Sequence, residues 1–353
     1  MVVATELSKA DRQQKSCWRF MGIEFAPFVI PLSRRLETLT VAWFFFSLLL
    51  AMFIIFPAFF YLLIFTKYWY LPVLYFSWIF LDRNTPLRGG RKLKWLRNSR
   101  IWNYYRDYFP VRLVKTADLA ADKNYVFCVY PHGVASVASL LNFQSNATHF
   151  DDLYPGIDPY LVVLNVNYRI PFTKDIWLAL GAIGAAEESI LYCLNGKPGT
   201  SCVIMPGGAK EALLSSPGDC KCVLKNRKGF VRVAMKSGAA LVPVFSFGEN
   251  DVFEQLSGPW VLWLQEQLRS IIGIAPCIIK GRGFFQYSFG VLPQRRPVTS
   301  VVGAPIHVPK TQNPSQELVD EYHQKYVDAL VALFEQYKAK YHVNGDRAKL
   351  LIV

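Results

Sequence analysis

A histidine that directly follows an apolar run is the first candidate for chemistry. His132 lies in Tyr130-Pro131-His132-Gly133, just after the apolar residues 125–129. Proline ends a strand and glycine permits a tight turn, so we expect the imidazole at the carboxyl end of a strand, where ligands of open α/β sheets bind. An imidazole that titrates near neutrality can take a proton from an alcohol as it attacks a thioester. The tripeptide alone is a weak signal, because most single histidines have structural roles.

Two glycine-containing turns, each with an acid, follow two other apolar runs. The first holds Gly207, Gly208 and Glu211, and the second places Glu249 directly after a glycine. Glycines at the start of a helix can present backbone N–H groups to an oxyanion or a phosphate. The alternative is a tight turn with an ordinary acid in the first helical turn. We expect either Glu211 or Glu249 to orient His132.

A set of basic residues lies between the two glycine-containing turns, just before the apolar run that leads to Glu249. Lys228, Arg232 and Lys236 recur every four residues, so they share one face of an expected helix. Such a face beside a glycine-rich turn would suit the phosphates of coenzyme A. A merely solvated basic face is the alternative.

The seven cysteines are scattered through apolar stretches, which favours a reducing compartment over a disulfide framework. Cys220 and Cys222 have no second ligand pair at zinc spacing, so we expect no metal site. Cys128 and Cys202 are alternative nucleophiles near strand ends, but a buried structural thiol is the favoured role for both. The sequon at Asn146 is expected to be unused.

The composition indicates that the protein associates with a membrane. The chain is 52% hydrophobic and 15% aromatic, and its formal charge of +13 favours an anionic partner. Nucleic acid, a phospholipid surface and coenzyme A would all satisfy the charge, but basic residues beside apolar segments indicate phospholipid headgroups rather than nucleic acid.

Residues 41–65 form an apolar run that is long enough to span a bilayer, with Pro57 expected to kink it. A shorter run, 71–81, follows, and basic residues flank the pair on both sides. We therefore expect a membrane hairpin over 41–81, with a cytosolic segment 1–40 before it and a cytosol-facing domain 82–353 after it. The alternative is a single crossing over 41–65 that places the rest in the lumen.

From residue 124 onward, short β-branched runs alternate with helical patterns, which predicts an α/β domain on a largely parallel central sheet. The last helix should begin with Asn313 as its N-cap and Pro314 at its first position. The expected strands are 125–129, 160–166, 201–205, 240–247 and 298–302, and the expected helices include 176–182, 211–214, 230–237 and 260–272.

Together these motifs resemble the type-2 diacylglycerol acyltransferase family, which includes monoacylglycerol and wax-alcohol acyltransferases. The resemblance covers most of the chain: the apolar hairpin, Tyr130-Pro131-His132-Gly133, Tyr168-Arg169-Ile170-Pro171-Phe172, Pro206-Gly207-Gly208-Ala209-Lys210-Glu211, and Arg227-Lys228-Gly229-Phe230. It implies a glycerolipid-acyltransferase-like central sheet flanked by helices, an acyl-CoA donor, and the endoplasmic reticulum membrane or lipid droplets with both termini cytosolic. It implies no cofactor beyond the acyl-CoA co-substrate.

Two departures bear on the mechanism. The wider glycerolipid acyltransferases carry an Asp five residues after the His, and Val137 stands there in this chain. Many type-2 members have a first His where this chain has Tyr130. The histidine that matches the catalytic one is therefore His132 alone.

The hypothesis from sequence is triacylglycerol synthesis from diacylglycerol, with His132 as general base and Glu211 or Glu249 holding the imidazole. Monoacylglycerol and long-chain alcohols are rival acceptors, a non-catalytic lipid-droplet hairpin protein is the rival class, and self-association is left open. The residues expected to contact substrate are Tyr130, Pro131, Gly133, Arg169, Gly207, Gly208, Arg227, Lys228, Gly229 and Phe230.

Overall fold

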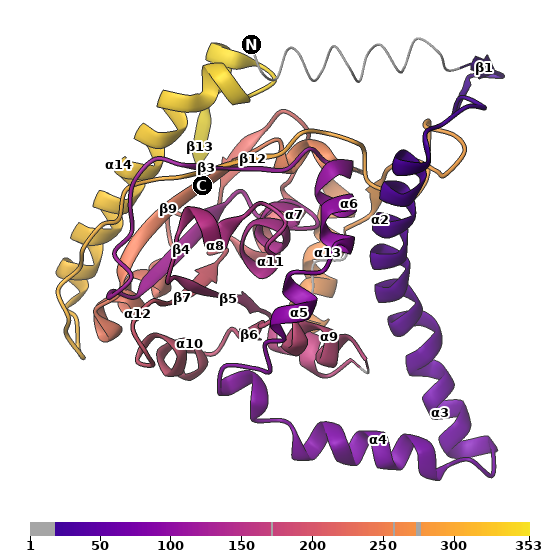
Figure 1. Ribbon diagram of the computed structural model, residues 1–353, viewed down its shortest axis with the longest axis horizontal. Helices are drawn as coiled ribbons and strands as arrows, with labels where there is room; N and C mark the ends of the chain where they lie inside the picture. The colour runs from indigo at the N-terminus through magenta and orange to yellow at the C-terminus, as the bar shows by residue number, and fades with distance from the viewer. Residues whose placement is uncertain (1–17, 171, 257, 273–276) are drawn as a thin grey trace.

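The computed structural model describes residues 18–353 apart from 171, 257 and 273–276. Residues 1–17 of the expected N-terminal segment, with Cys17, and Pro171 of the Tyr168–Phe172 motif therefore lie outside the described residues. Figure 1 shows a central sheet with helices on both faces, and a long N-terminal helical arm at one side.

The core is a seven-stranded sheet in the order β3-β12-β9-β4-β7-β5-β6. The strands from β9 to β6 are mutually parallel, whereas β12 runs antiparallel to β9 and parallel to β3. The sheet is therefore mixed, and its parallel part carries four of the five predicted strands, while the fifth is β12. The strands are β3 (Arg112–Lys115), β4 (Tyr125–Tyr130), β5 (Asp158–Val163), β6 (Ile183–Gly184), β7 (Thr200–Ile204), β9 (Ala240–Phe247) and β12 (Thr299–Val302).

All five predicted strands are present, within a few residues of the expected bounds. The short edge strands β3 and β6 were not predicted. Edge strands are short and partly polar, so they lack the continuous apolar signal of a strand that is covered on both faces.

Each face of β4 packs against a different group of helices, because successive side chains point to opposite sides. Cys128 and Tyr130 belong to the core beneath α12 (Gly229–Ser237) and α14 (Gln316–Tyr341). Phe127 and Val129 pack on the other side with Phe150 of α8 (Phe150–Leu153). All six residues of β4 are buried, which places the end of this strand in the middle of the molecule.

The last helix, α14, begins two residues later than predicted. Its N-cap is Ser315, whose hydroxyl oxygen accepts a hydrogen bond from the Leu318 N–H at 3.2 Å. The assignment of Asn313 as N-cap is therefore wrong, because Ser315 supplies the acceptor that the orphan N–H groups of the first turn need. Tyr326, Leu330 and Phe334 recur every four residues on this helix, and all three are buried against the sheet.

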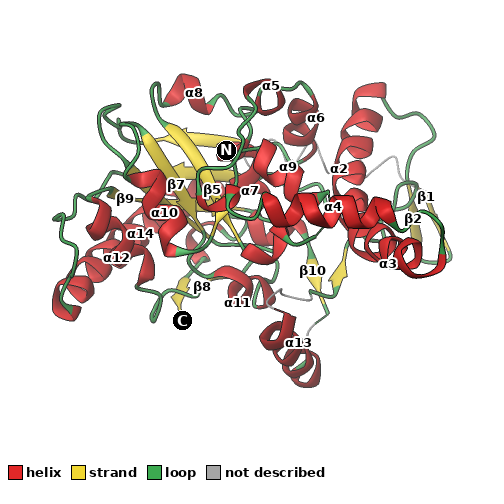
Figure 2. Cartoon of the chain, turned by 90° about the horizontal axis from the view of Figure 1, so that it is seen from below, coloured by secondary structure: helices red, strands yellow, loops and turns green. Residues whose placement is uncertain are grey.

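The N-terminal arm consists of α2 (Leu32–Leu50), a π-helical segment (Ala51–Ile55), α3 (Phe56–Phe65) and α4 (Tyr70–Leu81). The first half of α2 packs on α6 (Ile101–Tyr108), and Val41 is fully buried. The α3 helix leads away from the sheet, and α4 runs back beneath the domain, as Figures 1 and 2 show. Pro57 lies directly after the π-helical segment, inside the continuous helical run from Leu32 to Phe65, where it cannot donate the backbone hydrogen bond of an interior residue.

No helix among the described residues combines the length and the apolar character needed to cross a bilayer. The run 41–65 is divided among α2, the π-helical segment and α3, and α2 begins nine residues before it. The membrane hairpin over 41–81 stays a prediction.

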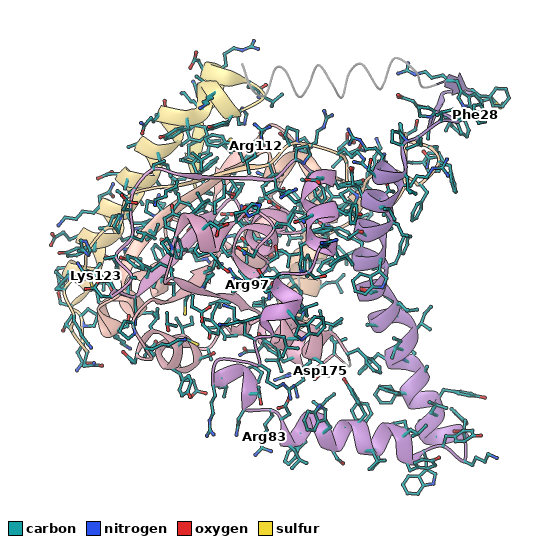
Figure 3. The ribbon with its side chains drawn as sticks, viewed as in Figure 1. Phe28, Arg83, Arg97, Arg112, Lys123 and Asp175 are labelled. Atoms are coloured by element: carbon teal, nitrogen blue, oxygen red, sulfur yellow. The ribbon has the colours of Figure 1, made fainter. Side chains whose placement is uncertain are left out.

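An ion cluster joins the end of α4 to α9 (Thr173–Ala179). Lys174, only 1% exposed, lies 2.6 Å from an Asp82 oxygen, and Arg91 bridges Asp82 and Asp175 at 2.8 and 3.1 Å. Tyr75 on α4 donates a hydrogen bond to Asp175 at 2.9 Å. Figure 3 shows Asp175 beside the end of α4 that Arg83 marks.

Candidate functional site

Three neighbouring parallel strands bring His132, Glu211 and Glu249 to one edge of the sheet. His132 follows β4, Glu211 lies in α11 (Gly208–Leu213) after β7, and Glu249 follows β9. Since β7 and β9 are the two neighbours of β4, the histidine lies between the two acids. The sequence prediction that these three residues belong together agrees with this arrangement.

Glu211 holds the turn after β4 by its backbone. One carboxylate oxygen accepts a hydrogen bond from the His132 N–H at 2.5 Å, and the other accepts from the Val223 N–H at 2.6 Å. Gly207 allows this approach, because a Cβ atom there would lie 2.2 Å from the carboxylate. Residues 131–138 carry the candidate base His132 and are called the catalytic turn below. Glu211 therefore joins this turn to the segment that follows β8 (Cys220–Cys222).

Glu249 holds the other side of the same turn. Its two oxygens accept hydrogen bonds from the N–H groups of Val137 and Ala138, each at 2.8 Å. Gly133 has φ +61°, and a Cβ there would lie 2.6 Å from Cγ of Glu249. Glycine is required at this position both for the left-handed backbone and for the contact. Val137 stands five residues after His132, where the wider glycerolipid acyltransferases have an Asp. Its backbone N–H bonds Glu249, an acid that is distant in the sequence.

The hydrogen bonds of both acids go to backbone N–H groups, so neither carboxylate bonds the imidazole in this structure. The ring is held locally instead: Nδ1 lies 2.8 Å from the Gly133 carbonyl oxygen and 3.1 Å from Oγ of Ser136. A carbonyl oxygen can only accept, so Nδ1 carries the proton and Nε2 has a free lone pair. Burial lowers the pKa of His132 below its ordinary value, which keeps the ring neutral.

Burial also acts on the two acids. It raises the pKa of Glu211 to about 7 and that of Glu249 to about 7, although the backbone hydrogen bonds oppose the shift. Both acids therefore titrate near neutrality, where His132 is to act as a base.

The catalytic turn also presents backbone donors. The N–H groups of Gly133 and Val134 donate to no acceptor in the part of the chain that the structure describes. Such groups can stabilise an oxyanion when a reacting carbonyl lies beside the imidazole. Glu211 lies between this turn and the turn that contains Gly207 and Gly208. Gly208 has φ +58°, and a Cβ atom there would meet open space.

Tyr130 and Phe230 lie in the core rather than at a substrate surface. Tyr130 is fully buried on the face that α14 covers, and Phe230 packs edge-on against Tyr326 at 4.9 Å. Pro131 is buried directly before the histidine.

The basic face of α12 is already paired with neighbouring helices. Lys228 forms an ion pair with Asp320 at 2.7 Å, Arg232 binds Gln316 and Lys236 binds Glu187. These partners make the face an interhelical contact, which weakens its assignment to coenzyme A phosphates. Arg169, Arg227 and Gly229 are exposed, and the charge of Arg227 acts on Glu211.

The cysteine alternative has little support. Cys128 and Cys202 are fully buried, and burial raises the pKa of both thiols well above the ordinary value. A buried thiol that resists ionisation is a poor nucleophile.

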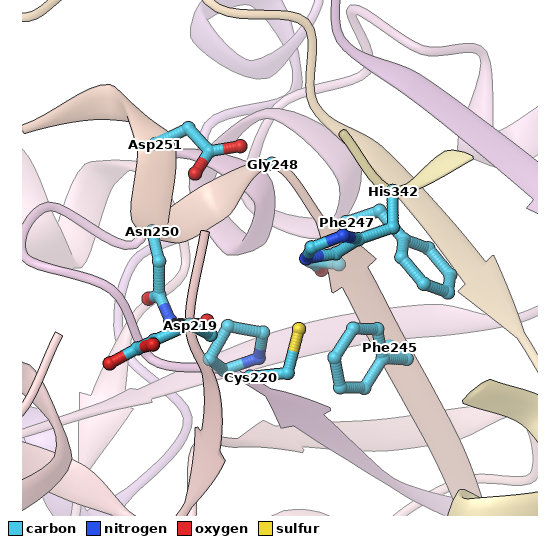
Figure 4. Close-up of a pocket in the computed structure, with 10 residues that line it drawn as sticks. Asp219, Cys220, Phe245, Phe247, Gly248, Asn250, Asp251 and His342 are labelled. Carbon is cyan, nitrogen blue, oxygen red and sulfur yellow. Dashed lines mark hydrogen bonds between the residues drawn. The ribbon is translucent and has the colours of Figure 1, made fainter. Parts of the chain in front are cut away.

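A small hollow of about 210 Å³, including the part open to solvent, lies behind the catalytic turn. Figure 4 shows its wall: Asp219, Cys220, Phe247, Asp251 and His342 converge from β8, β9 and the end of α14. Pro131 is the member of the turn that lines it, and His132 does not.

Two contributors to the site were missed from the sequence. Ser136 contacts Nδ1, and it also donates to the His132 carbonyl oxygen at 3.0 Å. The His-x3-Ser spacing was visible as a signal. Val223 contributes a backbone N–H, which no side-chain pattern reveals.

Comparison with known proteins addresses the chemistry of this site. The family model for diacylglycerol acyltransferase matches residues 61–352. The bovine (Bos taurus) 2-acylglycerol O-acyltransferase 1 is 42% identical over 327 residues, 92% of this chain and 97% of that protein. The human (Homo sapiens) diacylglycerol O-acyltransferase 2 is 44% identical over 282 residues, 78% of this chain and 72% of that protein.

A solved structure gives a more distant likeness. The 1-acyl-sn-glycerophosphate (LPA) acyltransferase PlsC from Thermotoga maritima has a TM-score of 0.39 and 11% identity, over 84% of this chain and 94% of that chain. The family match spans most of the sequence and includes His132, Glu211 and Glu249. The chain belongs to the diacylglycerol acyltransferase family and is an O-acyltransferase.

Proposed function

We propose that the protein transfers a fatty acyl group from an acyl-CoA thioester to the free hydroxyl of diacylglycerol, with His132 as general base. The hydrogen bond between Nδ1 and the Gly133 carbonyl oxygen carries this proposal. It fixes the tautomer whose Nε2 can accept a proton, and burial keeps that ring neutral.

The reaction then has two steps. Nε2 of His132 takes the hydroxyl proton as the alcohol oxygen attacks the thioester carbon, and the N–H groups of Gly133 and Val134 stabilise the oxyanion. The oxyanion collapses, the carbon–sulfur bond breaks, and the imidazolium returns its proton to the leaving sulfur. Glu211 and Glu249 act on the turn that carries these groups, so they are positioning residues.

Substitution of His132 tests this assignment. His132→Ala should reduce ester formation by about 10²- to 10⁴-fold in microsomes with equal amounts of protein. Arg296→Gln, an exposed change, serves as the matched control. Full activity of the alanine variant would refute the role of His132.

A monoacylglycerol acceptor is the second candidate. The bovine 2-acylglycerol acyltransferase matches this chain over 97% of its own length, and this observation favours it. Purified protein with labelled acyl-CoA and a panel of monoacylglycerol, diacylglycerol and long-chain alcohol would identify the acceptor by its ester. The rival of a non-catalytic hairpin protein is contradicted by the family match.

We place the protein at the endoplasmic reticulum membrane and lipid droplets, with residues 41–81 inserted from the cytosolic side. The described side chains of α3 are all at least partly exposed. Eight large apolar side chains of α3 and α4 are at least 46% exposed, including Tyr61, Phe65, Leu74 and Leu81. Lipid contact would remove this apolar surface from water. A C-terminal tag should be digested by protease added to sealed microsomes, and a protected tag would exclude the hairpin.

A further inference from the structure

Two arginines from a distant part of the chain, Arg282 and Arg295, pack against the first two turns of α2, and Arg295 is partly exposed. Arg282 is 6% exposed, and its Nε has no hydrogen-bond partner among the described residues. The guanidinium groups of Arg282 and Arg295 lie over the ring of Tyr108, at 5.4 and 4.1 Å from its centroid. Arg282 also lies 4.8 Å from the ring of Tyr287.

The charges in this cluster do not balance. Glu37 is the carboxylate that accepts from Arg295, and Arg34 lies 3.5 Å from the same oxygen. Arg282 has a hydroxyl in place of an acid, since its Nη2 donates to Oγ1 of Thr38 at 3.3 Å. The cluster thus contains three guanidinium groups and one carboxylate.

Burying an uncompensated charge is costly, and contacts with aromatic rings offset only part of the cost. Burial lowers the pKa of Arg295, although its hydrogen bond with Glu37 opposes this, and the charge of Arg282 lowers it further. An anion bonded to Nε of Arg282 would satisfy this buried donor and reduce the excess positive charge.

We propose that Arg282 and Arg295 form an anion site for a phosphate group carried by an amphipathic molecule. The planar fork of guanidinium donors matches phosphate oxygens. Thr38, on the second turn of α2, orients both arginines: its Oγ1 accepts from Nη2 of Arg282 at 3.3 Å and from Nη2 of Arg295 at 2.9 Å, and donates its proton to the Arg34 carbonyl oxygen.

The surroundings of the cluster indicate why the phosphate belongs to an amphipathic molecule. The strand β2 (Ile23–Phe25) pairs with the loop that carries Phe285, and Ala26 N–H donates to the Phe285 carbonyl oxygen at 2.9 Å. Phe285 is 82% exposed and Phe28 is 85% exposed. Figure 3 shows Phe28 beyond the N-terminal end of α2. A phospholipid headgroup and coenzyme A both combine phosphate with an acyl chain, so both fit this chemistry.

The first experiment measures phosphate binding by the full-length protein in neutral detergent. Inorganic phosphate, compared with chloride at equal ionic strength, should raise the midpoint of thermal unfolding of the wild type. Arg282→Gln should weaken the apparent phosphate affinity about tenfold or more, because it removes charge-assisted hydrogen bonds. Arg296→Gln, the neighbouring exposed arginine, should behave as the wild type does.

Arg282→Lys separates the site from a folding defect. It keeps the charge but loses the fork, so it should retain part of the phosphate-dependent shift. Equal shifts in the wild type, Arg282→Gln and Arg296→Gln would overturn the proposal, as would a wild type that phosphate does not stabilise.

The second experiment identifies the source of the phosphate. One arm compares binding of coenzyme A and of dephospho-coenzyme A, and the other compares nanodiscs of phosphatidylcholine with nanodiscs that also contain phosphatidic acid. Arg282→Gln should weaken one of the two by about tenfold or more and leave the other unchanged. The coenzyme A arm rests on the proposed function, but its readout is binding without turnover. Loss of activity in His132→Ala with intact binding would therefore separate the two claims, and an unchanged affinity of Arg282→Gln in both arms would refute the site.

Discussion

The catalytic turn and the end of α4 both contain carboxylates that are largely shielded from water, but the groups that bond these carboxylates differ. Glu211 and Glu249 are held by four backbone N–H groups. Asp82 at the end of α4 is held by the charged groups of Lys174 and Arg91, and by the hydroxyl of Thr85 at 2.5 Å.

The pKa values follow this difference. Burial raises the pKa of Glu211 and of Glu249 to about 7, because amide dipoles compensate only part of the lost hydration. Burial also acts to raise the pKa of Asp82, but Lys174, Thr85 and Arg91 outweigh it and lower that pKa below its ordinary value. The catalytic turn is thus fixed by groups that can lose their charge near neutrality, whereas the junction of α4 with α9 is fixed by permanent charges.

Removing a permanent charge from the junction should have the largest effect on stability. Lys174→Met leaves Asp82 short of its buried partner, and breaking a buried ion pair costs about 3–5 kcal/mol. Thermal and denaturant unfolding in detergent would measure the loss. Lys325→Met is the matched control, because Lys325 forms a half-exposed pair with Glu321, which contributes about 0–1 kcal/mol. If Lys174→Met and Lys325→Met lowered the free energy of unfolding equally, the buried ion cluster between α4 and α9 would contribute no more to stability than an exposed ion pair.

The pH dependence of stability should separate the two regions. Above a pH of about 4.5 the unfolded chain releases the proton of Glu249, while the folded chain keeps it up to a pH of about 7. The contribution of Glu249 to stability therefore falls as the pH rises through this window, by up to about 3 kcal/mol.

Glu249→Gln removes this titration, so the stability of the variant relative to the wild type should rise between pH 5 and pH 7 and level off above it. Asp82→Asn should show the opposite sign, since the charged Asp82 stabilises the fold above its unfolded pKa and loses this contribution as the pH falls. Unfolding midpoints measured across pH would test both. The same slope in the two variants would contradict the comparison.

The sequence analysis predicted that His132, Glu211 and Glu249 lie together, but it did not predict the groups that surround them. His132, Glu211 and Glu249 each follow a continuous apolar strand, and such a strand can be recognised from neighbouring residues in the sequence alone. The donors that the acids bind are backbone groups, including Val223, and these depend on pairings between distant segments. The basic face of α12 was predicted from spacing, but its acidic partner Asp320 lies on α14, and no local pattern links the two helices.

The two left-handed glycines of the site offer a smaller test. Gly133→Ala would place Cβ against Glu249, whose carboxylate is fixed by two hydrogen bonds, whereas Gly208→Ala would meet open space. Both variants bear the cost of a left-handed alanine, about 1–2 kcal/mol, and Gly133→Ala should lose about 1–3 kcal/mol more through overpacking. Unfolding and activity measured side by side would reveal this difference. Equal stabilities would mean that Glu249 yields freely and does not fix the turn.

The smallest effect should come from Ser136, whose partly exposed hydroxyl contacts only the ring and the carbonyl oxygen of His132. Ser136→Ala removes the hydroxyl beside Nδ1 but leaves the Gly133 carbonyl oxygen as its partner, so the tautomer persists. A loss of about 0.5–1.5 kcal/mol corresponds to a fall in kcat of roughly two- to tenfold, with KM unchanged. Ser237→Ala on α12, whose hydroxyl bonds its own helix, is the control. A rise in KM without a change in kcat would place Ser136 in substrate binding. The Gly133 carbonyl oxygen would then be the group that orients the imidazole.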